Sequence, residues 1–396
     1  MDAVRLTALR HALIEDLQRR GIITDDRIAA AFAAVPRDRF LPGLAAEQVY
    51  RDEAIVTKVR DDVALSSSSQ PAMMAIQLQQ LLLEPGHRVL EIGAGTGYNA
   101  ALLRFIVGAS GRVTTVDVDD DIVTAARAQI AAAGYDDVRV VLGDGGYGHA
   151  PDAPYDRIIL TVGAADLLPA WIEQLRPDGV IVLPLQLGAG MFSVALRKLP
   201  NGTLLSESLT ACGFIRLRGA FASVEQTLRV AGWDVVCEPG PRLDPARLAA
   251  LLGTPLGMPL GTRPLPPDAN EATLFLAFCA EPLAQLYRVT AANTPPTEGA
   301  RHALLDTAAM SACLLPPRWA HDTHGADASA LLFGSPAAYE RINALLARWA
   351  THDKPRPDTA RLLVLPPNTP PPAGTLALQR THATLLLAGR DGRPLT

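Results

Sequence analysis

The chain has 396 residues, a formal net charge of −5 and a hydrophobic content of 48%. This length predicts two domains with a large buried core. Arginine is abundant and lysine scarce, but no basic stripe is evident, so a nucleic-acid partner is not expected. No apolar run approaches the roughly 20 residues of a membrane span, and no signal peptide opens the chain. We therefore expect neither membrane insertion nor secretion.

The cysteines lie at positions 212, 237, 279 and 313, without C-x-x-C spacing. Scattered cysteines of this kind predict unpaired thiols in a reducing compartment. A cytoplasmic location follows as an expectation.

The N-terminal residues predict two helices. Residues 4–20 place apolar side chains on one helical face, and Thr24 is expected to cap a second, alanine-rich helix over 25–34. We expect residues 1–86, these helices and the loop that follows them, to belong to the same domain as the segment after them.

A serine-rich segment precedes the next predicted helix. Pro71 suits a first helical turn, and Ser69 or Gln70 is placed as its N-cap. Free backbone N–H groups and the helix dipole favour an anion at such a start, and serine hydroxyls can complete its hydrogen bonds. The carboxylate group of a bound molecule would fit at this position. The alternative is that one serine caps the helix and the others lie in a solvated loop.

The segment VLEIGAGTG over 89–97 predicts a cofactor loop. An apolar strand carrying Glu91 leads into Gly93, Gly95 and Gly97, and a helix follows. These glycines permit a sharp turn and close approach of a nucleotide-like ligand to the helix start. A nicotinamide dinucleotide usually requires G-x-G-x-x-G, whereas G-x-G-x-G near a strand-end acid favours S-adenosylmethionine.

Two later strands end in acids that fit the same cofactor. Asp117 is expected to accept hydrogen bonds from both ribose hydroxyls, and Asp144 from the adenine amino group. Asp119, Asp120 and Asp121 are expected to cap and charge the following helix. The cofactor set is completed by three flanking residues, Asn99, Val118 and Gly145.

Residues 87–222 predict the cofactor-binding core. Apolar strands near 88–92, 112–117, 138–142, 157–162 and 180–185 alternate with helical periodicity. This pattern indicates an α/β fold with a doubly wound, Rossmann-like parallel sheet, whose ligand lies outside the carboxyl ends of the strands.

Residues 223–396 predict a smaller accessory α+β domain. We expect a helix near 225–231, a loop over 255–268, strands at 273–280 and 360–366, a helix near 336–350 and an apolar segment over 375–389. His321, Asp322 and His324 are more simply solvated loop residues than ligands, and no metal site is expected.

Six segments follow one another along the chain: VPRDRFLP, a Ser-Gln-Pro helix start, VLEIGAGTGYNAALL, GDGGYG, YDRIILTVGAADLLPAWIEQLRPDGVIVLP and GFIRLRGA. In this order they resemble the protein-L-isoaspartate O-methyltransferases over about residues 30–222. The resemblance implies methylation of an aspartyl or isoaspartyl carboxyl group in a peptide or protein. It implies an acceptor site at Ser69, Ser68 and Ser67. It also implies a substrate-binding groove lined by Ser66, Gln70, Thr161, Val162, Gly163, Ile215, Arg216 and Leu217.

The acceptor loop departs from the family pattern. The usual G-x-G-Q-T-I-S-Q-P is replaced by AIVTKVRDDVALSSSSQP over 54–71. With its long C-terminal extension, the chain resembles family variants that accompany ribosomally made modified peptides such as lanthipeptides and graspetides. That resemblance implies a cyclised ribosomal peptide precursor as the substrate. A backbone nitrogen would attack its aspartyl methyl ester to give an aspartimide, or isoaspartate after hydrolysis.

The expected chemistry needs no general base, because a carboxylate with a pKa of about 4 is already ionised at neutral pH. Alignment of the reacting atoms and exclusion of water would supply the catalysis. Two alternatives stay open. One is general isoaspartyl repair of damaged proteins, and the other is a cofactor-binding scaffold without turnover.

Overall fold

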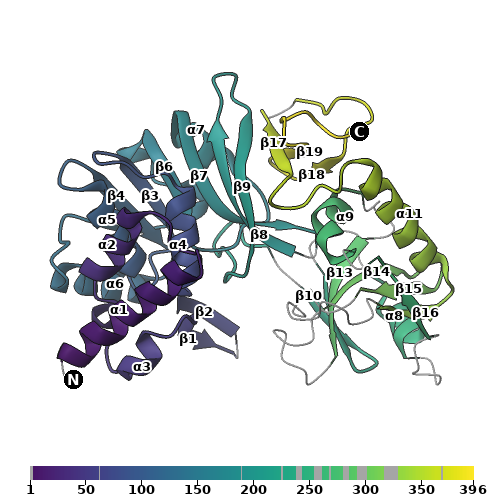
Figure 1. Ribbon diagram of the computed structural model, residues 1–396, viewed down its shortest axis with the longest axis horizontal. Helices are drawn as coiled ribbons and strands as arrows, with labels where there is room; N and C mark the ends of the chain where they lie inside the picture. Colours follow the sequence, from purple (N-terminus) through teal and green to yellow (C-terminus); the bar gives the residue numbers. More distant parts are fainter. Residues whose placement is uncertain are drawn as a thin grey trace.

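The computed structural model describes residues 3–61, 63–188, 190–223, 226–237, 243–253, 261–266, 269–279, 285–291, 301–315, 329–366 and 369–396. Within these ranges the strands form sheets of ten, seven and two strands. The ten-stranded sheet extends from the N-terminal helices to strands near the C-terminus of the chain (Figure 1).

The N-terminal helices are α1 (Ala3–Arg19) and α2 (Asp26–Ala34), and the short η1 (Arg37–Phe40) and α3 (Ala46–Val49) follow them. Leu17 of α1 and Phe32 of α2 are buried against the core, as the periodicity predicts. The predicted cap is wrong by one residue. Asp25 caps α2 by accepting from the Arg27 N–H, whereas the Thr24 hydroxyl donates to Gln79 Oε1 at 3.0 Å.

The parallel half of the large sheet matches the predicted strands. Its order is β7-β6-β3-β4-β5, and each neighbouring pair is parallel. The strands are β3 (Arg88–Ile92), β4 (Arg112–Asp117), β5 (Arg139–Leu142), β6 (Tyr155–Leu160) and β7 (Leu175–Leu187). The helices are α4 (Pro71–Gln80), α5 (Tyr98–Val107), α6 (Asp120–Ala132) and α7 (Pro169–Gln174). The doubly wound Rossmann-like fold is confirmed.

The sheet continues into antiparallel strands from distant parts of the chain. After β8 (Gly190–Lys198) and β9 (Leu204–Cys212), the next strand is β17 (Arg361–Leu365), followed by β19 (Thr384–Ala388) and β18 (Ala377–Gln379). Leu204 pairs with Val364 across this junction, and side chains from both sides share one apolar core. Three strands from the region after residue 222 thus extend the sheet of the core, and the division into domains stays a prediction.

The seven-stranded sheet is antiparallel, with order β10-β11-β13-β14-β15-β16-β12. Its strands are β10 (Gln226–Val230), β11 (Trp233–Cys237), β12 (Gly261–Pro264), β13 (Gln285–Ala291), β14 (Arg301–Asp306), β15 (Ser311–Leu314) and β16 (Ser329–Gly334). The associated helices are α8 (Pro245–Leu252), η4 (Ala269–Ala272), α9 (Thr273–Cys279) and α11 (Ala337–Thr351).

Two predictions in this region are wrong, and a third is wrong in part. Residues 226–230 of the expected helix near 225–231 form strand β10, which pairs along its length with β11. Residues 273–279 of the expected strand at 273–280 form helix α9, whose apolar side chains are buried. A continuous apolar run has no periodicity that would distinguish a helix from a strand. Part of the expected loop at 255–268 is strand β12. His321, Asp322 and His324 lie outside the described residues.

Cys212, Cys279 and Cys313 are free, as expected, and burial raises the pKa of each thiol. Across the described ranges, no group of three or more histidine, cysteine or acidic side chains could hold a metal ion. No described helix has the length and hydropathy to cross a bilayer.

Candidate functional site

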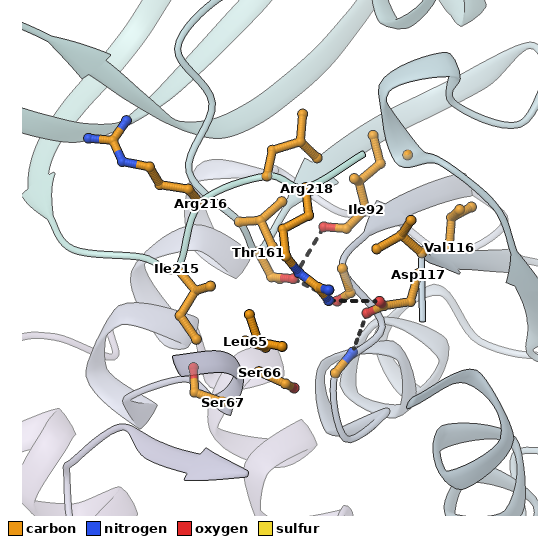
Figure 2. A pocket seen from close by; sticks show the side chains of 16 residues that line it. Leu65, Ser66, Ser67, Ile92, Val116, Asp117, Thr161, Ile215, Arg216 and Arg218 are labelled. Atoms are coloured by element: carbon orange, nitrogen blue, oxygen red, sulfur yellow. Dashed lines mark hydrogen bonds and ion pairs between the residues drawn. The ribbon is translucent and has the colours of Figure 1, made fainter. Parts of the chain in front are cut away.

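A pocket opens at the carboxyl ends of β3, β4 and β6, where a doubly wound sheet binds its ligand (Figure 2). Its walls come from the hairpin of β1 (Ile55–Arg60) and β2 (Val63–Ser68), the glycine loop, the end of β4 and the segment 215–218. The lining residues are Leu65, Ser66, Ser67, Ile92, Gly93, Gly95, Val116, Asp117, Val118, Gly145, Thr161, Val162, Ile215, Arg216, Leu217 and Arg218.

The glycine loop has the backbone that its sequence predicts. Gly93, Gly95 and Gly97 have φ angles of +103°, +50° and +82°, in the region that disfavours other residues. A Cβ on Gly93 would lie 2.6 Å from Thr161 Oγ1, and one on Gly97 would lie 2.7 Å from Ile130 Cγ1. Gly93 and Gly95 therefore line the pocket, whereas Gly97 allows α5 to begin close against α6.

Asp117 lies in the pocket wall at the end of β4. Its Oδ2 accepts from the Gly95 N–H at 3.2 Å, so the carboxylate and the glycine loop hold each other in place. Burial raises the pKa of Asp117, and the N–H groups of Gly95 and Asp119 and the charge of Arg218 oppose that rise. A carboxylate at this position can accept hydrogen bonds from a ligand's hydroxyls.

Glu91 and Asn99 lie behind the glycine loop and do not line the pocket. The fully buried Glu91 carboxylate accepts from Asn99 Nδ2 at 2.8 Å and from Thr115 Oγ1 at 2.6 Å. Burial raises the pKa of Glu91 to about 7, despite these two hydrogen bonds. In this structure the pair links β3, β4 and the first turn of α5, and supports the loop from within.

Asp144 is engaged by the backbone. Its carboxylate oxygens accept from Gly146 N–H at 2.8 Å and from Ala220 N–H at 2.6 Å, so it holds the chain after residue 218 against the β5 loop. The adjacent Gly145 lines the pocket, and its carbonyl accepts from Trp171 Nε1 at 2.8 Å. The pocket edge near Gly145 is thus fixed from two sides.

The four serines divide into two pairs. Ser66 and Ser67 line the pocket, whereas Ser68 and Ser69 do not. Ser66 Oγ accepts from Thr57 Oγ1 at 3.1 Å across the hairpin, and Ser68 Oγ accepts from Arg37 at 3.2 Å. The serine run is therefore mostly strand β2, rather than a loop before the helix.

The start of α4 already carries a carboxylate from elsewhere in the chain. Gln70 occupies the N-cap position without a side-chain cap, and Asp52 Oδ1 accepts from the Ala72 N–H at 2.8 Å. The Gln70 side chain donates to the Asp52 carbonyl at 3.0 Å. The pocket is thus lined by Ser66 and Ser67, whereas the Ala72 N–H at the start of α4 is already occupied by Asp52.

Arg37 is a structural residue that the sequence analysis missed. Its side chain is 1% exposed and donates to backbone carbonyls, including those of Val49 at 2.8 Å and Ser69 at 2.9 Å. Burial lowers the pKa of this guanidinium. The signal was present in VPRDRFLP, where an arginine follows an apolar Val-Pro pair.

The opposite wall joins two expected substrate segments. Gly163 N–H donates to the Ile215 carbonyl and Leu217 N–H to the Gly163 carbonyl, both at 2.8 Å. Ile215, Arg216 and Leu217 line the pocket together with Thr161 and Val162, while Gly163 lies behind them.

Arg218 is the second residue that the sequence analysis missed. It continues the 215–217 wall, and its guanidinium reaches Asp117 Oδ1 at 3.8 Å (Figure 2). It lies within the GFIRLRGA segment, but its contact with Asp117 joins segments about a hundred residues apart, which the sequence does not reveal.

The chain is similar in sequence to the proteins of one family. A family model described as protein-L-isoaspartate(D-aspartate) O-methyltransferase (PCMT) matches residues 8–221. A protein-L-isoaspartate O-methyltransferase from Methanopyrus kandleri is 37% identical over 211 residues, covering 53% of this chain and 91% of the relative. One from Archaeoglobus fulgidus is 34% identical over 212 residues, covering 54% and 94%. The chain belongs to this family. As a member it is an S-adenosylmethionine-dependent methyltransferase, which confirms the predicted enzyme class and cofactor.

Solved structures extend the likeness in fold. A structure titled protein-L-isoaspartate O-methyltransferase superposes with a TM-score of 0.53 at 23% identity, covering 89% of this chain and 96% of its own. Since residues 1–222 are little more than half of the chain, this overlap includes much of the C-terminal part. The alignment with that structure therefore extends beyond the catalytic core into the C-terminal part of the chain.

Proposed function

We propose that the pocket binds S-adenosylmethionine against Gly93, Gly95, Asp117, Val118 and Gly145, and that it receives the acceptor carboxylate at Ser66 and Ser67. One observation carries this proposal. The glycine loop and Asp117 lie in the same cavity as the two serines and the segment 215–217. Groups that suit the cofactor and groups that suit a polar acceptor thus line the same pocket.

The residues present fit the cofactor. Gly93 and Gly95 leave the loop without side chains at the cavity, and Asp117 offers carboxylate oxygens to ribose hydroxyls. When bound, the cofactor supplies a methyl group on a positively charged sulfur. The acceptor is ionised at neutral pH, so this chain's residues need only orient it in line with the methyl group and exclude water.

The substrate that we propose is an aspartyl or isoaspartyl residue of a constrained ribosomal peptide, whose methyl ester goes on to an aspartimide or isoaspartate. The support is the hairpin β1–β2, whose sequence replaces the family's usual glycine-rich approach and supplies the wall at Ser66 and Ser67. An altered wall at the acceptor suits an altered acceptor.

General repair of isoaspartyl proteins is the second candidate. It is favoured by the fold likeness over 89% of the chain, because a long C-terminal part then does not by itself indicate a dedicated peptide substrate. The accessory residues would serve recruitment in the first case and stability in the second.

The deciding experiment offers two substrates to the full chain, with labelled methyl donor. One is a short isoaspartyl peptide and the other a cyclised ribosomal precursor encoded beside the gene. A kcat/KM at least tenfold higher for the precursor supports the dedicated role. Equal or higher kcat/KM for the isoaspartyl peptide supports repair. Cofactor binding without transfer to either substrate would support the scaffold reading and contradict both.

A further inference from the structure

Asp119 stands at the N-cap position of α6 without capping it. Its backbone is extended, with φ −100° and ψ 122°, but its side chain accepts no cap hydrogen bond from the helix. The carboxylate instead faces two cations from separate segments. Lys58 Nζ lies 2.7 Å from Oδ2, and Arg218 Nη1 lies 3.0 Å from Oδ1. The expected capping role is therefore wrong for this residue.

The two cations belong to opposite walls of the pocket. Lys58 lies on β1 and pairs in register with Ser66, one of the lining serines. Arg218 directly follows the lining residues 215–217. One carboxylate thus bridges the hairpin wall and the 215–218 wall, two residues after Asp117.

Partial burial distinguishes this cluster from ordinary surface pairs. The Lys58 and Asp119 side chains are each 19% exposed and Arg218 is 27% exposed, whereas Asp121, the second partner of Lys58, is 68% exposed. Charges shielded from solvent interact more strongly and are screened less by salt. The hydrogen bond from Arg218 and, to a smaller extent, that from Lys58 lower the pKa of Asp119 to about 2. Asp119 is consequently ionised throughout the neutral range.

We propose that Asp119 is a shared counter-ion that holds the two pocket walls together over the bound cofactor, with Lys58 and Arg218 as positioning residues. The proposal rests on this pocket being the cofactor site. Holding the walls together slows escape of the cofactor and its demethylated product, and keeps water from the reacting atoms. Opening for exchange requires at least one of the two ion pairs to separate.

The test measures dissociation of S-adenosylhomocysteine, by competition, from the full chain carrying Asp119→Asn. We expect the dissociation rate to rise about three- to tenfold, because two partly exposed charge pairs are lost. The matched control is Asp121→Asn, which removes a partner of Lys58 but leaves the bridge, and its rate should stay within twofold of the unmodified chain. A rate for Asp119→Asn as slow as that control would overturn the proposal.

A second variant keeps the proposal testable if Asp119→Asn folds poorly. Lys58→Met, on the exposed hairpin, should speed dissociation in the unmodified chain and add little in the Asp119→Asn background. Hydrogen exchange of β1 and β2 without ligand should be faster in Lys58→Met than in Asp121→Asn. Equal effects of Lys58→Met in both backgrounds would contradict the shared bridge.

Failure of the clamp is distinguishable from failure of the cofactor site. If Asp117→Ala weakens S-adenosylhomocysteine binding while Asp119→Asn leaves its dissociation unchanged, the site stands and the clamp is wrong. If neither substitution changes binding, the pocket assignment itself is wrong.

Discussion

Asn99 donates its side-chain amide to Glu91 Oε1 at 2.8 Å, joining the first turn of α5 to the strand on which the cofactor loop begins. The Glu91 residue in this contact is fully buried. The acid that appears in the sequence as a ligand-facing group is thus an internal support of the loop.

Glu91 should make stability depend on pH. Burial raises its pKa to about 7 from 4.5, so the folded chain holds the proton more tightly than the unfolded chain does. Its contribution to stability is therefore lost as pH rises from about 4.5 to about 7. Glu91→Gln removes the charge. The free energy of unfolding of this variant should therefore increase relative to that of the unmodified chain as the pH rises across this window, by roughly 3 kcal/mol at most.

Denaturant unfolding at pH 5 and pH 8 would measure this difference. Glu47→Gln provides the control, since the Glu47 side chain is 46% exposed and pairs with an arginine, so its effect should change little between the two pH values. A Glu91→Gln effect of the same size at both pH values would show that Glu91 is ionised in the fold throughout.

Asp117 should contribute directly to cofactor affinity. Asp117→Ala removes the wall carboxylate and its hydrogen bond with Gly95, and we expect weaker S-adenosylhomocysteine binding by about 1–3 kcal/mol. Calorimetric titration measures it, with Asp137→Ala as the control because that side chain is 54% exposed and pairs with Arg104 outside the pocket. Unchanged affinity in Asp117→Ala would exclude the ribose role.

The serine pairs should separate transfer from stability. Ser66→Ala with Ser67→Ala should lower kcat/KM for methyl transfer at least tenfold while cofactor affinity stays nearly intact, since both residues line the pocket. Ser68→Ala with Ser69→Ala should instead lower the melting temperature, because Arg37 loses its hydroxyl partner at Ser68. If the Ser68→Ala, Ser69→Ala variant lost methyl transfer and the Ser66→Ala, Ser67→Ala variant kept it, the acceptor site would lie at the start of α4.

The C-terminal strands should be needed for a stable core. A fragment of residues 1–222 leaves β9 without its partner β17 and exposes apolar side chains such as Leu204. We expect it to aggregate or to melt well below the full chain, and a fusion of 1–222 to 355–396 through a flexible linker to recover solubility. A soluble 1–222 fragment that melts like the full chain would contradict this structural role.

The sequence predicted the features that depend on local pattern. The parallel strands, the glycine loop and Asp117 follow from apolar runs, turn residues and the position of an acid at a strand end. The parallel strands and the loop conformation are confirmed, and Asp117 lies in the pocket wall as the pattern predicts.

The remainder depends on contacts between distant segments, which one sequence does not reveal. Asp52 caps α4 from twenty residues away, Arg218 meets Asp117 across the pocket, and β17 joins β9 across more than a hundred residues. The sequence of α9 is apolar almost throughout, so its pattern does not distinguish a helix from a strand.

The placement of β17 beside β9 has a consequence for synthesis on the ribosome. Residues 1–212 emerge first, and 148 residues lie between Cys212 and Arg361. At about 5–20 residues per second, the edge of β9 waits unpaired for roughly 7–30 s. An open apolar strand edge invites pairing with another nascent chain, so translation speed and chaperone access should affect the yield of this protein.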